Sequence, residues 1–313
     1  MLVATIAAAL VLTAASRASA ETLACQPPTS PLARLICGDP LLRAADAEEN
    51  GIYEGALLAS LDRSSLREEE RAWFGHEILP YNWFAQQHMP IDNSKVIEAY
   101  RQRGTALRQE ARDWRKLRHG VSGATLANTC LALPQRSGDC TVTAFASIEA
   151  APALRYQQQT YAQPTTSNAI VIFAPVPEEP HDWLPLAVAS SHAALTPPQA
   201  IVSPNRSLLL IAESGGSGPA ALYRLTPDAL EDIDDRGWLE TLHAHLPDGL
   251  ALARDITADY AQMQAVSKVT RSQSTCCAVG STAMIDLAIE NDRVVVSGIT
   301  FGTPEGPPDS NQN

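Results

Sequence analysis

The sequence predicts an α+β protein in which a small helical domain precedes an α+β domain with mainly antiparallel strands. Between residues 38 and 118, apolar residues recur every three or four positions, which is the period of an amphipathic helix. Beyond residue 119, short β-type runs are separated by glycine and proline, which is typical of strands joined by turns. Because helices and strands are segregated along the chain rather than alternating, the α+β class is favoured.

Three helices are expected in the first part. The first follows Asp39-Pro40, since proline is favoured in the first turn of a helix. The second opens with Ser65 and Glu68, which have the spacing of a capping box, and is expected to end at Pro80. The third carries a narrow apolar stripe and is preceded by polar residues suited to capping. The stripe is Ile97, Tyr100, Gly104, Leu107, Ala111 and Trp114, and the capping residues are Asp92, Asn93 and Ser94.

A boundary near His119-Gly120 precedes the strands. Strands are expected at residues 141–148, 169–173, 208–212, 283–289 and 294–301. Asn291-Asp292 lies between the last two and predicts a hairpin turn. Helices are expected at about residues 235–245 and 258–269, and residues 303–313 have the composition of a disordered tail. The predicted domains are therefore 21–118 and 119–302.

The first twenty residues predict export. Residues 2–15 form an uncharged apolar run that is too short to span a bilayer, and Ala18-Ser19-Ala20 follows as a small-x-small cleavage pattern. We expect residues 1–20 to be a signal peptide and the protein to be periplasmic or secreted. The alternative is a lipoprotein in which Cys25 carries the lipid. No other apolar run is long enough for a transmembrane helix.

Charge and cysteine content limit the partners and the compartment. The formal net charge of −12 argues against nucleic acid and anionic membranes, which require a positive surface, and favours basic partners. Six cysteines in an exported chain predict disulfides. The closely spaced pairs Cys25/Cys37 and Cys130/Cys140 are the simplest candidates. For the adjacent Cys276 and Cys277, we expect separate partners, or one free thiol.

No catalytic, cofactor-binding or metal-binding motif is identified. The segment Gly215–Pro219 lacks both the final glycine of a nucleophile elbow and the lysine of a P-loop, so it is interpreted as a turn. His243 and His245 are two positions apart on a predicted helix and point to different faces, which makes shared metal ligation with Asp248 awkward. The acidic residues Asp232, Asp234 and Asp235 are interpreted as a solvated run with no acid–base role.

Residues 25–117 carry a spaced pattern of cysteines, aromatic residues and charges. Its segments are Cys25, Ile36-Cys37-Gly38-Asp39-Pro40, Asp46 with Tyr53, Glu70-Arg71-Ala72-Trp73, and Tyr100-Arg101-Gln102-Arg103. This pattern resembles the N-terminal domain of the lysozyme inhibitor LprI family. At Glu49 the chain departs from the family pattern, which has an apolar residue there.

The resemblance implies an envelope protein that binds and inhibits lysozyme. The stretch from Pro80 to Pro90 is expected to be irregular, and its aromatic density makes it a candidate partner contact. The alternative for these side chains is that they cap the core between two helices, and Tyr53, Trp73 and Trp114 are likewise expected in the core. An alternative function is a periplasmic enzyme or small-ligand-binding protein whose site lies in the C-terminal domain. The candidate contact residues are Tyr81, Trp83, Phe84 and His88.

Overall fold

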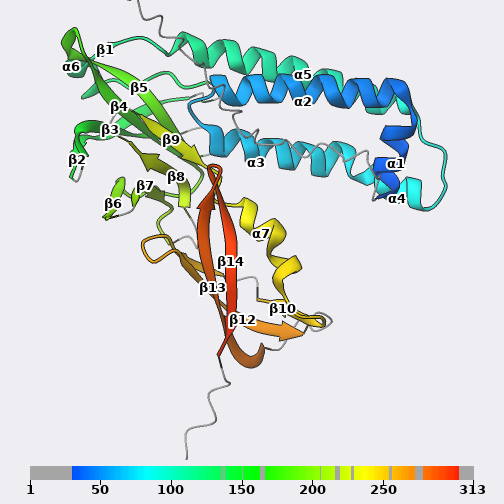
Figure 1. Ribbon diagram of the computed structural model, residues 1–313. Coiled ribbons are helices and arrows are strands. Elements are labelled where there is room, and N and C mark those ends of the chain that lie inside the picture. The colour runs from blue at the N-terminus through cyan, green and yellow to red at the C-terminus, as the bar shows by residue number, and fades with distance from the viewer. Residues whose placement is uncertain are drawn as a thin grey trace, which may run out of the picture.

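A computed structural model describes residues 30–302, and its helical region is followed by antiparallel sheets, which confirms the α+β class (Figure 1). Gaps fall at residues 135, 137, 150, 163–165, 205, 216–218, 227–228, 254–255 and 272–277. The backbone alone is described at residues 152, 180, 219, 240, 243, 271 and 278–281. No helix of the described residues is both long and apolar enough to cross a membrane.

The helical region contains two long helices that lie antiparallel, with shorter ones beside and beyond them (Figure 1). The first and third predicted helices are confirmed. Asp39 caps the first by accepting from the Leu41 and Leu42 amides, and Asp92 caps the third through Ser94. The helices are α1 (Pro31–Gly38), α2 (Pro40–Ala59), α3 (Arg63–Trp73), the π-helical turn η1 (Phe74–Ile78), α4 (Pro80–Gln86) and α5 (Asn93–Lys116).

The second predicted helix was expected to run to about Ile78, and α3 with η1 ends there, but its start differs. Asp62, not Ser65, is the N-cap of α3, and its carboxylate accepts from the Ser65 amide at 3.1 Å, so the capping-box prediction is wrong. Pro80 begins α4 rather than leaving an irregular stretch, because a proline at the first helical position loses no intrahelical hydrogen bond.

The described residues form three sheets, and each pair of neighbouring strands in them is antiparallel. Sheet 1 has the order β1 (Val121–Ser122), β5 (Glu179–Ser191), β4 (Ser167–Val176), β3 (Ala151–Tyr161), β2 (Cys140–Ile148). Sheet 2 has the order β6 (Gln199–Ser203), β7 (Arg206–Ala212), β8 (Pro219–Leu225), β9 (Leu230–Ile233). Sheet 3 has the order β10 (Leu250–Leu252), β12 (Gln264–Arg271), β13 (Ala278–Glu290), β14 (Arg293–Phe301), and β11 (Thr257–Asp259) also pairs with β12.

The five predicted strands are confirmed as β2, β4, β7, β13 and β14. The Asn291-Asp292 hairpin turn is confirmed, and both residues have positive φ, as a type I′ turn requires. The helix expected near 235–245 is confirmed as α7 (Gly237–Thr241) and the 3-10 turn η2 (Leu242–His245), and a short helix α6 (Gly123–Leu126) precedes β2. The helix expected at 258–269 is wrong. Met263 takes a left-handed φ of 54° there, and the chain turns back between β11 and β12.

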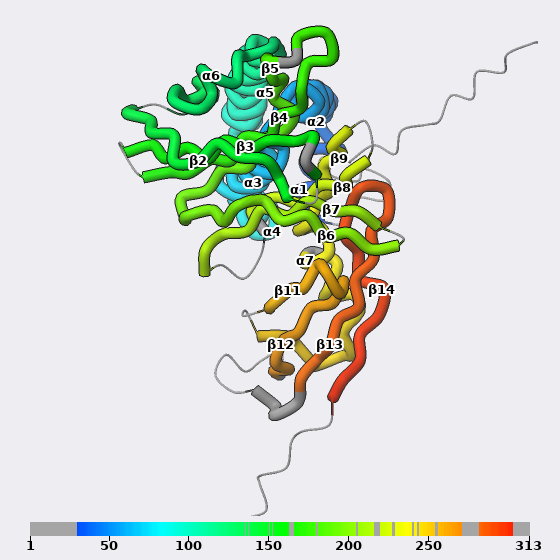
Figure 2. Tube along the Cα trace, turned by 90° about the vertical axis from the view of Figure 1, so that its left-hand side faces the viewer, coloured from blue at the N-terminus to red at the C-terminus, as the bar shows by residue number. Residues whose placement is uncertain are grey.

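Figure 2 shows sheets 1, 2 and 3 following one another down the molecule, and the buried contacts place α5 against sheet 1. One face of β4 places Val171 and Phe173 against Trp114 of α5 and its neighbours. The other face places Ile170 and Ile172 against Leu209 and other residues of sheet 2. The opposite face of sheet 2 packs on α7 and sheet 3 through Leu208, Leu222, Trp238, Ile285 and Val294. Both faces of β4 are therefore buried, which explains its unbroken apolar run.

Candidate functional site

A charged cleft lies where α3 meets the ends of sheets 1 and 2. Its volume of ≈ 680 Å³ is within the range of small-molecule sites. The walls come from α3, from Arg136, from the end of β5, and from the residues between β9 and α7. The lining residues are Ser64, Ser65, Arg67, Glu68, Glu69, Arg71, Arg136, Ser190, Ser191, His192, Ala193, Glu213, Ala220, Asp234, Asp235 and Arg236.

The first wall is fixed by Asp62, which joins α3 to β5. Its carboxylate accepts from the Ser190 hydroxyl, and the same hydroxyl accepts from Arg136 at 2.6 Å. The Leu61 carbonyl accepts from the Val188 amide at 2.7 Å, so the start of α3 is also tied to β5 through the backbone. These bonds hold the N-terminal turn of α3, with Ser64 and Ser65, at the edge of the cleft.

Burial of Asp62 changes its ionisation. Desolvation raises the pKa of its carboxyl to about 7, although the hydrogen bonds from Ser190 and the Ser65 amide favour the charged form. A substantial share of Asp62 is therefore protonated near neutral pH. The positive charge of Arg136, which lies nearby, is then only partly balanced by this carboxyl.

The second wall contains the acidic residues that were expected to be solvated, and that expectation is wrong. Asp232, Asp234 and Asp235 are all buried. Arg67 of α3 donates to Asp232, and Arg71 of α3 lies 3.5 Å from Asp234. Asp232 and Asp234 tolerate burial because arginines from a helix more than 160 residues earlier face them.

Asp234 also organises the chain that follows it. Its Oδ1 accepts from the amides of Arg236 and Gly237 at the start of α7, and Arg293 of β14 lies 3.6 Å from its Oδ2. Asp235 lines the cleft beside it, and burial raises the pKa of its carboxyl to about 7. Arg236 reaches across the rim to Glu68 at 3.0 Å.

The third wall comes from the end of β5 and from Glu213. The Ser191 hydroxyl donates to Glu213 and accepts from the Ala193 amide at 2.9 Å. Within the described part of the chain, no hydrogen bond joins a serine of this cleft to His192, so a nucleophile–base pair is not assembled. The arrangement is suited to holding a polar ligand, because cationic and anionic groups both line it.

The predicted contact residues lie together at the end of the helical region farthest from the sheets (Figure 1). Trp83 and Phe84 of α4 are in edge contact with ring centroids 5.2 Å apart, and Tyr81 lies 6.3 Å from Phe84. Tyr81 packs against the core around Ile78, whereas Trp83 is 55% exposed. His88 is exposed beyond the helix, with a φ of 54°. Tyr81 therefore contributes to the core, and Trp83 faces solvent.

The residues of the family-like pattern meet inside the helical region. Tyr100 donates to Asp46 at 2.9 Å, and its ring contacts Trp73 edge-on with centroids 5.6 Å apart. Arg103 donates to Glu70 at 2.9 Å. Burial, followed by the charge of Glu70, raises the pKa of Glu49 to about 8, so Glu49 is predominantly neutral at pH 7. Tyr53 and Trp114 are buried and Trp73 is half-buried, so this pattern builds the helical core.

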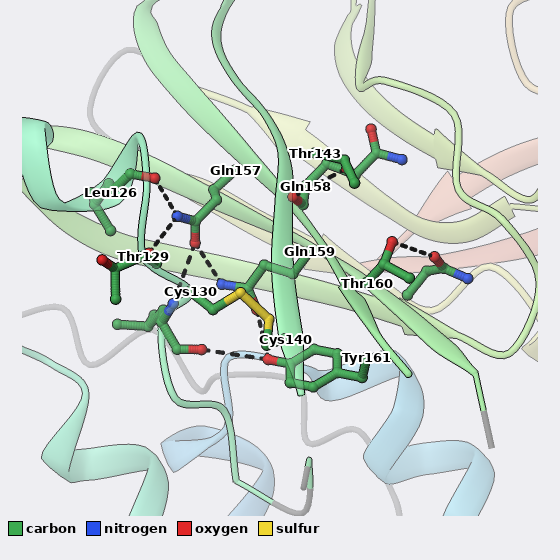
Figure 3. The surroundings of a disulfide bond; sticks show 12 residues. Leu126, Thr129, Cys130, Cys140, Thr143, Gln157, Gln158, Gln159, Thr160 and Tyr161 are labelled. Atoms are coloured by element: carbon green, nitrogen blue, oxygen red, sulfur yellow. Dashed lines mark hydrogen bonds between the residues drawn. A yellow bond between two sulfur atoms is a disulfide. The ribbon is translucent and has the colours of Figure 1, made fainter. Parts of the chain in front are cut away.

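The Cys130–Cys140 disulfide is confirmed and ties the segment after α6 to the start of β2 (Figure 3). Beside it, the buried amide of Gln157 donates to the carbonyls of Leu126 and Thr129. Cys37 is also in a disulfide. Cys25, Cys276 and Cys277 lie outside the described residues, so the Cys25–Cys37 pairing stays a prediction.

The remaining candidate motifs supply no further site within the part of the chain that the structure describes. Residues 216–218 of the glycine-rich turn and the side chain of His243 lie outside the described part, and His245 belongs to η2. Among the described residues, no three potential metal ligands come together. Comparison with protein-family models, with curated proteins and with solved structures finds no match.

Proposed function

We propose that this protein acts outside the cytoplasm by binding a basic envelope protein, with a lysozyme as the leading partner, through the aromatic end of its helical region. The observation that carries the proposal is the exposure of Trp83. A tryptophan left 55% exposed beside a second aromatic ring, on the short helix α4 at the end of the helical region, presents the kind of anchor that dominates binding energy at protein interfaces.

Charge supports the choice of partner. Lysozymes are commonly basic, and the net charge of −12 attracts a basic protein over a distance of about the Debye length. Such attraction speeds encounter, and the aromatic contact then supplies short-range affinity. The resemblance of residues 25–117 to the lysozyme inhibitor LprI family points to the same partner.

The test is the rate at which lysozyme clears a suspension of bacterial cell walls in the presence of the chain from Glu21 onward. We expect inhibition at micromolar protein in low salt, and we expect it to weaken as ionic strength rises. Trp83→Ala should raise the concentration required for half-inhibition by about thirtyfold, since a central aromatic anchor contributes about 2 kcal/mol or more.

Leu58→Ala is the matched control, because Leu58 is a large apolar residue of α2 that is 70% exposed and lies outside the aromatic end. It should inhibit as the parent protein does. Equal inhibition by Trp83→Ala and the parent would move the contact away from α4. Absence of inhibition by the parent protein in low salt would remove lysozyme as the partner.

A further inference from the structure

We infer that the cleft between α3 and the ends of β5 and β9 binds a short peptide by its free ammonium and carboxylate termini. This site is separate from the aromatic end of the helical region, and it does not depend on the function proposed there. The inference rests on which charges of the cleft are already paired within the protein, on where the remaining ones lie, and on the volume of ≈ 680 Å³.

Three of the four arginines that line the cleft are engaged in ion pairs. Arg67 pairs with Asp232, Arg71 with Asp234, and Arg236 with Glu68. Arg136 is different: within the described residues it makes no ion pair, and its only side-chain hydrogen bond goes to the Ser190 hydroxyl. A guanidinium has five N–H donors in a planar fork that matches a carboxylate, so Arg136 retains the capacity to bind one.

The carboxylates show the complementary pattern. Glu213 accepts a hydrogen bond from Ser191, and Glu69 accepts one from Ser65 at 3.4 Å. Within the described residues neither forms an ion pair with a cationic side chain, so both are suited to a ligand ammonium group. Arg136 and Glu213 each share a hydrogen bond with a serine at the end of β5, Ser190 and Ser191 respectively. Both charges line the same cleft of ≈ 680 Å³, so one ligand of a few residues can span them.

The mixture of charges selects the ligand class. A purely anionic ligand would be repelled by Glu69, Glu213 and the buried Asp235, and a purely cationic one would be repelled by Arg136. A molecule with one charge of each sign can place each charge beside a group of opposite sign. The cleft is large enough for a molecule of several residues, and the buried Ser64 hydroxyl has no partner, so it is available to a peptide group of the ligand.

The test is calorimetric titration of the chain from Glu21 onward with trialanine, N-acetyl-trialanine and trialanine amide, with trilysine and triglutamate as variants of side-chain charge. We expect trialanine to bind, and blocking either terminus to weaken binding about tenfold or more, because each block removes a charge-assisted hydrogen bond. Equal binding of the free and blocked forms, or no binding of any of the three free tripeptides at millimolar concentration, would overturn the inference.

Two substitutions locate the contacts. Arg136→Gln should weaken binding of trialanine but leave binding of trialanine amide unchanged. Glu213→Gln should weaken binding of trialanine but leave binding of N-acetyl-trialanine unchanged. Arg108→Gln is the control, since Arg108 is an exposed arginine of α5 paired with Glu48 away from the cleft. If Arg136→Gln fails to fold, Arg136→Lys keeps the charge and should retain the preference for a free carboxylate. Loss of affinity for all three forms alike would contradict the assignment of Arg136 to the carboxylate.

Discussion

At the N-terminus of α3, Asp62 performs two tasks that oppose each other. It caps the helix, which favours a carboxylate, and it is buried against β5, which favours the neutral acid. The folded pKa of about 7 lies above the value of 3.8 for an exposed aspartate, so the folded state binds this proton more tightly than the unfolded state. Its stabilising contribution is complete below pH 3.8 and is lost as the pH rises through about 7.

Asp62→Asn should therefore flatten the fall in unfolding free energy between pH 5 and pH 8, because asparagine still caps the helix and does not ionise. The change in slope should amount to about 1 kcal/mol or more across this interval, measured by urea unfolding at several pH values. Asp39→Asn is the control. Backbone hydrogen bonds lower the pKa of Asp39, so its contribution is lost only at acidic pH. An unchanged slope in Asp62→Asn would show that this carboxyl stays ionised.

Among the elements, the segment from α6 to the start of β2 relies on a covalent link. Removing the Cys130–Cys140 disulfide, which closes a loop of sequence separation 10, should lower the unfolding free energy by about 2–3 kcal/mol. The measurement is urea unfolding of Cys130→Ala/Cys140→Ala against the parent. A double variant as stable as the parent would mean that the hydrogen bonds of Gln157 hold the segment alone. Adding reductant to the double variant separates the contribution of the disulfide that contains Cys37.

Elements were predictable from sequence where local pattern and final environment agree. The run from Ala169 to Phe173 is apolar because β4 is buried on both faces, and the strand was expected. The neighbouring strand β3 is not predicted, because the three consecutive glutamines at 157–159 do not have the composition that is typical of a strand. Gln157 and Gln159 are fully buried and satisfied by hydrogen bonds, which only the assembled structure supplies. Residues 258–269 have a helical composition, but pairing of β12 with β13 outweighs that local preference.

At the scale of the molecule, the Arg67–Asp232 pair connects the helical region to sheet 2. Both side chains are largely buried, so Arg67→Met should lower the unfolding free energy by about 3 kcal/mol by leaving Asp232 without a countercharge. The double variant Arg67→Met/Asp232→Asn should recover part of that loss. Arg108→Met removes an exposed pair and should cost less than about 1 kcal/mol. Thermal or urea unfolding of the four proteins measures this, and a double variant no more stable than Arg67→Met would refute the charge-balance account.

The cleft itself was not predictable from sequence. Asp232, Asp234 and Asp235 look like a hydrated acidic run because their countercharges, Arg67 and Arg71, lie in a helix distant in sequence. The wholly charged run Arg-Glu-Glu-Glu-Arg at residues 67–71 is also typical of a solvated helix face. Opposite charge in two separated segments was the available signal, and it carries no information on which segments meet. By contrast, the aromatic cluster on α4 is visible in the sequence because its members are close neighbours along the chain.

The burial of both faces of β4 has a consequence for how the chain reaches its native state. One face is covered by residues that precede the strand, in α5 and α6, and the other by residues that follow it, in β7 and β8. During synthesis the preceding part of the chain can cover only the first face. Ile170 and Ile172 on the other face therefore stay exposed to solvent until sheet 2 has been synthesised. The central strand is thus the point of greatest risk for aggregation during synthesis, and the chain has to extend through β9 before that risk is removed.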